Sequence, residues 1–200
     1  MDHNASGSNW GNVATGTTYT DVTAVSNVSL VDGADGDVAT IGQVKSAYEK
    51  YLDADTVDVG LIIAGSSLTA VHIDNLITIA ENRMDAVVFA SPERSDVVNI
   101  SNTNTQKDNV VSFFNGINSS SYVFFDSGYK YQYDRYNDVY RYVPLNGDTA
   151  GLAARTDLIA DAWYSPAGLN RGIVRGAVKL AFNPTKTQRD ELYRARVNPV

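Results

Sequence analysis

The sequence of 200 residues contains no cysteine and only two histidines, His3 and His72. Without cysteine, disulfides and thiolate metal sites are excluded, and two histidines are too few for a histidine-rich metal site. No apolar run approaches the roughly 20 residues that a membrane span needs. The first residues, MDHNASGSNWGN, lack the basic start and apolar stretch of a secretory signal. We therefore expect no metal site, no membrane segment and no such signal.

Charge is unevenly distributed along the chain, whose formal net charge is −7. Residues 1–104 carry 14 acidic and 4 basic side chains, whereas residues 105–200 carry 9 acidic and 12 basic ones. The overall acidity argues against general nucleic-acid binding. The acidic first half and the basic second half either fold onto each other or pair between copies, and the sequence leaves both readings open.

The length and composition suit one globular domain with a sizeable core, because 44% of the residues are hydrophobic and 20% charged. We interpret residues 1–27 as a polar linker or edge segment and residues 28–200 as a single α/β domain. Loosely spaced valines predict a strand at 22–31. The DGADGD that follows predicts a turn, because it lacks the later glutamate and the spacing of an EF-hand calcium loop.

From Thr40 onward, helical and strand patterns alternate. Apolar residues at helical spacing behind Thr40 predict a helix over 40–53. Short apolar runs at 57–65, 85–93 and 122–126 predict strands that are buried on both faces of a sheet. A second and a third helix, the latter near 105–117, separate these strands. The alternation predicts a mixed, largely parallel sheet with right-handed crossovers and with helices on its faces.

The second of these helices has a distinct apolar face, and its end is basic. Its core-facing residues are predicted to be Ile73, Leu76, Ile77 and Ala80, with Arg83 near the end. His72 lies one step off this face, so we expect it to be half-buried or exposed. Ser66 and Ser67 precede the helix, where they either bind an anion or, more simply, cap the helix.

Six of the twelve tyrosines fall within residues 129–142. Their alternation on both sides of a polar turn predicts an antiparallel hairpin in which 129–134 pairs with 139–144. We expect Tyr129, Tyr131 and Tyr133 to pack on one face, because a buried ring removes a large apolar area from water. Opposite charges would pair on the other face. An exposed set of rings would instead suit a carbohydrate-binding module, which remains the alternative.

Three further segments follow the hairpin. Residues 145–157 predict a cap and a helix of small residues that lets other backbone approach closely. Residues 171–182 alternate, which predicts a strand with Val174, Val178, Leu180 and Phe182 on one side and Arg175 and Lys179 on the other. The end of the chain predicts a short helix capped at Thr185 or Thr187.

Motifs of catalysis and phosphate binding are missing. The sequence contains no GxGxxG, no GxxxxGK[ST] and no GxSxG, and nothing marks a particular pair among its 23 acidic residues. We therefore name no catalytic, cofactor-binding or metal-binding residue and expect no cofactor. A hydrolytic or nucleotide-binding α/β domain without a recognised motif stays open as an alternative.

The second half of the chain carries a resemblance. The stretch YVFFDSGYKYQYDRYNDVYRYVPLNGDTAGLAARTD, then WYSPAG and TKTQRDELYRARVNPV, closely resembles the contractile tail sheath proteins of T-even-type phages. LVDGADGD and VDVGLIIAG are also similar to the sheath pattern. The resemblance covers roughly residues 28–200 and is most specific from 122 onward.

The resemblance implies a structural protein and not an enzyme. Sheath subunits stack as hexameric rings around an inner tube, above a baseplate, and contract to drive the tube through the target envelope. It implies the virion tail as the location, with assembly in the host cytoplasm, and neither nucleic acid nor membrane as a partner. This chain stops at NPV and lacks an N-terminal half-domain of the family, so we interpret it as a fragment or a truncated relative.

If subunits stack head to tail, the basic residues near the end of the chain would meet the acidic residues near 32–58 of another copy. We expect the basic residues at 171, 175 and 179 to lie on or beside a polar strand face, and those at 189, 194 and 196 to lie on the final helix. The candidate inter-subunit contacts are Arg171, Arg175, Lys179, Arg189, Arg194 and Arg196.

Overall fold

The computed structural model describes residue 33 and residues 36–66 and 69–200, to which the following account is confined. The chain divides into two units, Met1–Val38 and Ala39–Val200, and every helix and strand given below belongs to the second. The strand expected at 22–31 and residues 32, 34 and 35 of the DGADGD turn lie outside the described residues.

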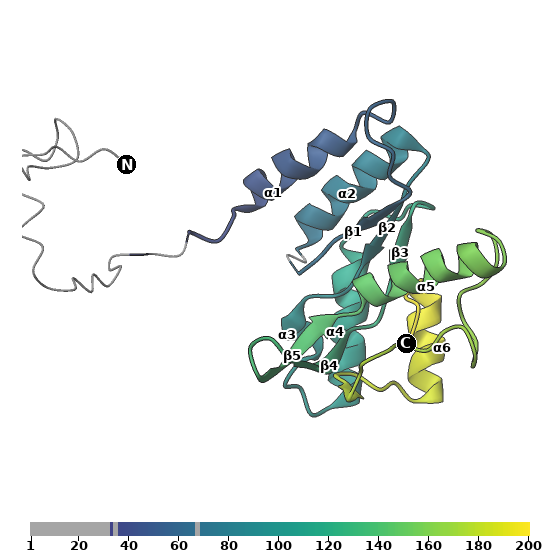
Figure 1. Ribbon diagram of the computed structural model, residues 1–200. Coiled ribbons are helices and arrows are strands. Elements are labelled where there is room, and N and C mark those ends of the chain that lie inside the picture. Colours follow the sequence, from purple (N-terminus) through teal and green to yellow (C-terminus); the bar gives the residue numbers. More distant parts are fainter. Residues whose placement is uncertain (1–32, 34–35, 67–68) are drawn as a thin grey trace, which may run out of the picture. The chain divides into compact units, whose positions relative to one another are not determined.

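A three-stranded parallel sheet forms the centre of the second unit (Figure 1). Its strands are β1 (Leu61–Ile63), β2 (Val87–Ala90) and β3 (Val123–Phe125), in the order β1-β2-β3. The central strand β2 pairs with both neighbours in parallel, which confirms the predicted strand–helix alternation. Val88 and Ala90 on β2 are fully buried, as expected for a central strand with both faces covered.

The two outer strands are less buried than predicted. Leu61 and Ile63 on β1 are 38% and 41% exposed, while Ile62 between them is 4% exposed. On β3, Phe125 is buried, whereas the two residues before it are only half-buried. The expectation of burial on both faces is therefore wrong for β1, because it is the edge strand and one of its faces is incompletely covered.

Helices begin and end largely where the pattern predicts. Helix α1 (Ile41–Tyr48) is capped by Thr40 and continues as the 3-10 helix η2 (Glu49–Tyr51). Helix α2 (Ala70–Arg83) buries all four predicted core residues at 2% exposure or less. Its cap is Thr69, whose hydroxyl accepts from the His72 amide, so the prediction of a serine cap is wrong.

Four more helices follow in the described part of the chain. A single turn, α3 (Arg94–Val97), precedes α4 (Thr103–Asn115), which is the predicted third helix. Helix α5 (Asn146–Ile159) contacts β1 and β2 and crosses the parallel sheet in Figure 1. Helix α6 (Lys186–Arg194) is capped by Thr185, one of the two predicted residues, and packs against α4.

Helix α5 begins where the prediction places it, but without a side-chain cap. Its N-cap residue is Leu145, which makes no capping hydrogen bond with its side chain. Ala150 and Thr149 pack inward, but a Cβ added at Gly147 or Gly151 would meet nothing within 4 Å. The predicted close approach of other backbone therefore does not occur at these two glycines.

The tyrosine hairpin forms in the predicted register. Strand β4 (Tyr129–Asp134) pairs antiparallel with β5 (Val139–Pro144), so that Tyr131 lies opposite Tyr142 and Tyr133 opposite Tyr140. Tyr129 is 3% exposed and donates its hydroxyl to the carbonyl of Pro92 at 3.1 Å. Tyr133, however, is 47% exposed, because it lies near the open turn, so the expected packing is wrong for this ring.

The predicted strand over 171–182 shortens to β6 (Lys179–Leu180), which pairs with β4. The preceding residues form turns instead. Gly176 has a φ of +70°, and the Gly172 amide donates to the carbonyl of Gly168 at 2.8 Å. These turns end the alternation that predicted a longer strand, and the two rows of side chains on opposite faces do not form.

The last residues of the chain close the unit beside β3. The amide of Asn198 donates to the carbonyl of Phe125 at 2.8 Å, and Asn198 bridges Asp126 in parallel fashion. Val197 and Leu192 are 1% and 0% exposed. The segment after α6 thus adds one isolated parallel β-bridge beside β3. The fold is α/β with an antiparallel tyrosine hairpin, as predicted.

Candidate functional site

The six candidate basic residues occupy three neighbouring parts of the chain. Arg171 and Arg175 lie in the turns before β6, and Lys179 lies on β6. Arg189 and Arg194 lie on α6, whereas Arg196 follows that helix in the left-handed conformation, with φ +63°. Only Lys179 therefore lies on a strand, and Arg196 lies just beyond the helix on which it was expected.

Three of the six hold intramolecular contacts that are not ion pairs. The Arg171 guanidinium lies 4.6 Å from the Tyr164 ring centroid, and the Lys179 ammonium lies 5.1 Å from that of Tyr131. Arg196 donates to the Ser119 hydroxyl. Within the described part of the chain, none of the six forms an ion pair with an aspartate or glutamate.

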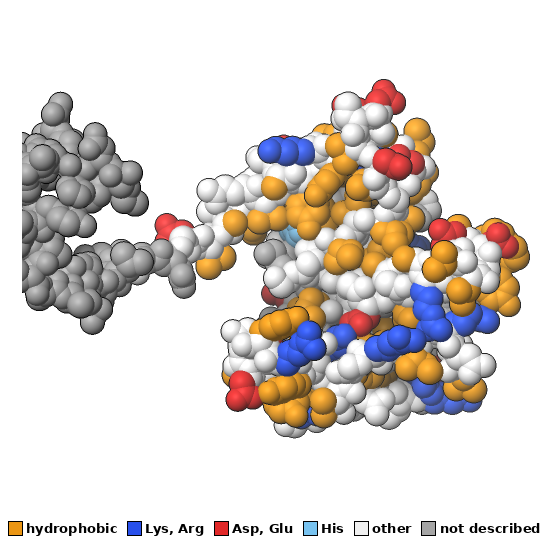
Figure 2. Space-filling view, in the orientation of Figure 1, with side chains coloured by type: hydrophobic (Ala, Val, Ile, Leu, Met, Phe, Trp, Pro, Cys, Tyr) orange, Lys and Arg blue, Asp and Glu red, His pale blue; other side chains and the backbone are white. Residues whose placement is uncertain are grey.

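The ion pairs that do form stay within one half of the chain. In the first half they are Lys45 with Glu49 and Arg83 with Asp85. In the second half they are Lys107 with Asp108 and Glu191, Lys130 with Asp148, and Arg141 with Asp134. Among the described residues no ion pair joins the acidic first half to the basic second half. Figure 2 shows most basic side chains over the region of α5, α6 and the hairpin, whereas acidic side chains lie where α1 and α2 end and also at the far end of α5 and at the hairpin.

The turns before β6 also expose large apolar side chains. Trp163 is 80% exposed and Leu169 is 93% exposed, and Leu158, at the end of α5, is 86% exposed. Sequence reasoning did not single out these residues as a surface. The signal was present, since the segment combines large apolar residues with proline and glycine and has no period that would bury them.

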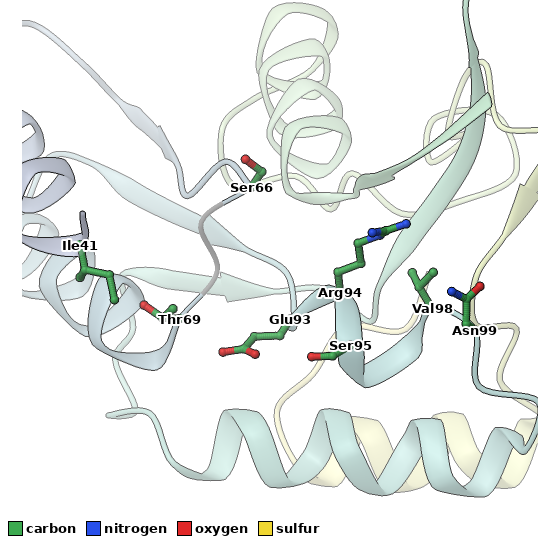
Figure 3. A pocket seen from close by; sticks show the side chains of 8 residues that line it. All are labelled: Ile41, Ser66, Thr69, Glu93, Arg94, Ser95, Val98 and Asn99. Atoms are coloured by element: carbon green, nitrogen blue, oxygen red, sulfur yellow. The ribbon is translucent and has the colours of Figure 1, made fainter. Parts of the chain in front are cut away.

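A shallow pocket of about 560 Å³ lies at the carboxyl ends of β1 and β2 (Figure 3). It is lined by Ile41, Ser66, Thr69, Glu93, Arg94, Ser95, Val98 and Asn99. Figure 3 shows the Glu93 and Arg94 side chains pointing in different directions, so they do not converge on one ligand position. The Thr69 hydroxyl is already used as the helix cap.

The acidic residues near the pocket have structural contacts of their own. Asp96 accepts a hydrogen bond from the amide of Glu93 at 3.0 Å, and burial together with the Glu93 charge raises its pKa to about 6. No group of three metal-ligating side chains occurs in the described ranges, and no described helix is long and apolar enough to cross a bilayer. The pocket therefore presents neither a catalytic pair nor a phosphate cradle.

His72 is buried, at 1% exposure, which contradicts the expectation of a half-buried or exposed side chain. Its Nε2 lies 3.2 Å from the carbonyl oxygen of Ala64, and its ring lies edge-on to Tyr48 with centroids 5.2 Å apart. Burial lowers its pKa. Helix α1 covers it, and this long-range contact leaves no trace in the pattern of α2 itself. Among the described residues no acidic side chain is hydrogen-bonded to the ring, so none of them orients it as a catalytic base.

A family model, that of the phage tail sheath protein central domain, matches residues 37–200. The chain belongs to the phage tail sheath family. The matched range contains both sheets and all the described helices, so the whole α/β unit corresponds to the family's central domain.

The chain is also similar in sequence to individual tail sheath proteins. The chain is 42% identical over 176 residues to the tail sheath protein of Enterobacteria phage T4, which covers 80% of the chain and 27% of the relative. It is 38% identical over 168 residues to the tail sheath protein of Vibrio phage KVP40, covering 74% of the chain and 25% of the relative. The chain thus spans about a quarter of the length of these curated sheath proteins.

Proposed function

We propose that the chain is part of a structural subunit of a contractile tail sheath, which polymerises around an inner tube and contracts to drive it through the target envelope. The observation that carries the proposal is the match of the entire α/β unit, residues 37–200, to the sheath central domain. Under this proposal the subunit works by changing its neighbours and not by catalysis, and it uses no cofactor.

The proposed partners are those of a sheath. Copies of the subunit form hexameric rings, which contact the inner tail tube protein and the baseplate, with neither nucleic acid nor membrane as a partner. The protein acts in the virion tail and assembles in the host cytoplasm. Residues 28–200 act as one core domain in the ring, and residues 1–27 act as a polar linker or edge segment.

Electron microscopy tests the proposal directly. We expect the purified protein, expressed with any flanking sequence that its gene encodes, to form hollow tubes in negative stain, because polymerisation is the defining behaviour of a sheath. A protein that stays monomeric at high concentration, with and without purified tail tubes as templates, would overturn the proposal.

We further propose that Arg171, Arg175, Lys179, Arg189, Arg194 and Arg196 contact acidic residues of neighbouring subunits. Their lack of intramolecular ion pairs among the described residues supports this. Exposed ion pairs are worth about 0–1 kcal/mol each. Contacts of this strength suit a lattice that exchanges one set of neighbours for another, whereas a large apolar interface would resist the exchange.

Charge reversal tests these contacts. Arg175, Arg189 and Arg194 have exposed side chains without a described hydrogen bond, so their replacement leaves the fold intact. We expect the triple variant Arg175→Glu, Arg189→Glu, Arg194→Glu to form few or no tubes, because each repulsive contact recurs in every subunit. Circular dichroism and electron microscopy together separate folding from assembly.

The control is Arg135→Glu, at the exposed turn of the hairpin, where no candidate contact lies. This variant should assemble normally. Tubes of normal length and number from the triple variant would refute the proposed contacts while leaving the sheath function itself untouched.

A further inference from the structure

No residue of helix α1 is buried, although the helix packs against α2 (Figure 1). Val44 and Tyr48 are half-buried, and the other residues of the helix are exposed. A helix of eight residues is marginal by itself in water, because few hydrogen bonds oppose its unfavourable nucleation. Helix α1 therefore depends on a small number of contacts with the rest of the domain.

Tyr48, the last residue of α1, makes two of these contacts. Its hydroxyl donates to the carbonyl of Ile63 at 2.9 Å. Its ring lies edge-on to the ring of His72 on α2, with centroids 5.2 Å apart. The attachment of α1 to the domain thus includes direct contact with a titratable ring.

The His72 ring is buried, and one of its nitrogens has no partner. The side chain is 1% exposed, and its Nε2 lies 3.2 Å from the carbonyl oxygen of Ala64, so the neutral ring donates from Nε2. Nδ1 has no hydrogen-bond partner among the described residues. A second proton would have to bind at Nδ1, where it would be buried without an acceptor, and burying an unpaired charge is strongly unfavourable.

The side chains of α1 do not stabilise such a charge. Tyr48 faces the ring and stays neutral, because burial raises the pKa of its hydroxyl. Lys45 and Glu49 are exposed and pair with each other at 3.7 Å. The end of β1 contributes only the backbone carbonyl of Ala64 to the ring.

Helix α2 and the residues before it do not supply a counter-charge either. The carboxylate nearest to His72 in the sequence of α2 is that of Asp74, which accepts from the amide of Asn118 at 3.0 Å. Ser67 and Leu68 lie outside the described residues, and neither has a titratable side chain. Burial lowers the pKa of His72, and the hydrogen bond to the Ala64 carbonyl opposes this only in part.

We propose that protonation of His72 releases α1 from α2, which makes α1 an acid-sensitive element of the domain. While α1 is in place, the proton would be buried, whereas release of the helix opens the ring to water. The released state therefore keeps the ordinary histidine pKa of 6.5, and the packed state has a lower one. Below pH 6.5 the released state binds more protons, so the attachment of α1 is complete at neutral pH and weakens as the pH falls. The proposal concerns the domain alone and does not depend on sheath assembly.

Hydrogen exchange of the full chain at pH 7 and pH 5 tests the release, with each rate corrected for its intrinsic value. We expect the protection of residues 44–49 to fall about tenfold more in the wild type than in His72→Gln, because glutamine keeps a donor for Ala64 and does not titrate. Residues 73–80 of α2 should respond alike in the two proteins. His72→Phe keeps a ring against Tyr48 but cannot be protonated, so it should behave like His72→Gln. Titrations elsewhere cancel in these comparisons.

Nuclear magnetic resonance gives a reciprocal measurement, since the chain contains only two histidines. We expect His72 to titrate with a lowered pKa in the wild type and closer to its ordinary value in Tyr48→Ala, because removing this ring loosens α1. Tyr136→Ala, at an 83% exposed ring of the hairpin turn, is the matched control and should leave the titration unchanged. A His3→Gln variant assigns the two signals.

An equal loss of protection in the wild type and in both His72 variants would overturn the proposal, because α1 would then open for another reason. An ordinary pKa of His72 in the wild type would overturn it too, as would a lowered pKa that Tyr48→Ala leaves unchanged, because α1 would then not shield the ring. The wild-type titration needs no substitution, so the proposal can fail even where a His72 variant folds poorly.

Discussion

The Asp126 side chain is fully buried where β3 ends, at 0% exposure. Its two oxygens accept hydrogen bonds from the Ser91 hydroxyl at 2.7 Å and from the Gly128 amide at 3.0 Å. Ser91 in turn accepts from the amide of Asn146 at the start of α5. These hydrogen bonds join β2, β3 and α5, but they do not offset the cost of burying a charge. Burial raises the pKa of the Asp126 carboxyl to about 8.

The raised pKa predicts a pH-dependent stability. Between its unfolded pKa near 3.8 and its folded pKa of about 8, the folded state holds a proton on Asp126 that the unfolded state has lost. The stabilisation is therefore complete at low pH and is lost as the pH rises through this window. Relative to Asp126→Asn, we expect the wild type to lose on the order of 3 kcal/mol of unfolding free energy between pH 5 and pH 8.

Urea unfolding at the two pH values measures this difference. The asparagine keeps the shape of the side chain and stays neutral, so titrations elsewhere cancel when the two proteins are compared. Asp108→Asn, at a carboxyl that is 69% exposed, serves as the control. A wild-type-minus-variant difference that is the same at pH 5 and pH 8 would show that Asp126 does not titrate in this range.

Arg83 is the second buried ionisable residue that organises its surroundings. Its side chain pairs with Asp85 at 2.7 Å and donates to the carbonyls of Tyr51 and Val57 at 2.5 and 2.9 Å. It thereby holds the backbone of residues 51–59 against the end of α2. Lysine has a single ammonium and cannot reproduce the forked geometry of a guanidinium.

We expect Arg83→Lys to cost about 1–3 kcal/mol of unfolding free energy, because the carbonyls of Tyr51 and Val57 lose hydrogen bonds to a buried charged donor. Hydrogen exchange should also accelerate within residues 51–59. Arg135→Lys, at an exposed arginine, is the matched substitution and should change neither quantity. If residues 51–59 exchange at the same rate in the wild type and in Arg83→Lys, Arg83 does not hold this segment.

At the scale of elements, the hairpin depends on stacked rings. The Tyr131 ring is 5.3 Å from Tyr140 and 4.7 Å from Tyr142, centroid to centroid, and Lys179 on β6 covers it. Aromatic pairs add about 0.5–1.5 kcal/mol beyond the area they bury. Tyr131 thus connects all three strands of the antiparallel sheet.

Removing this ring should destabilise the unit far more than removing an exposed one. We expect Tyr131→Ala to cost about 2–3 kcal/mol in chemical denaturation, because the ring loses two aromatic partners and buried area. Tyr136→Ala, at an 83% exposed ring in the same hairpin, should change stability by less than about 0.5 kcal/mol. Similar losses in the two variants would mean that the stacking contributes little.

At the scale of the whole molecule, the chain should be indifferent to the ligands that α/β folds often bind. It has two histidines, no cysteine and no phosphate-binding motif. We expect Mg-ATP and zinc to leave the Tm within about 1 °C of its value without ligand, since only binding to the folded state raises Tm. A large rise that saturates with ligand concentration would reveal a site that neither motif nor geometry indicates.

Much of the fold follows from local patterns. The period of 3.6 in α2 places Ile73 and Leu76 in the core, and the period of two in the hairpin sets Tyr131 opposite Tyr142. Such patterns predict the structure incorrectly where an element is short or lies at the edge of a sheet. The alternation over 171–182 is interrupted by turns at Gly172 and Gly176, and β1 remains half-exposed because one face of this edge strand is incompletely covered.

Local periodicity and cap residues in the sequence were thus sufficient for the α/β class and the hairpin register, because both depend on neighbours within a few positions. The family was indicated by a different signal, the resemblance of residues 122–200 to sheath proteins. Contacts between distant segments were not encoded in this way. The burial of His72 under Tyr48 and the anchoring of residues 51–59 by Arg83 arose from packing in three dimensions. A one-dimensional pattern records which face a side chain occupies on its own element, but not which other element covers that face.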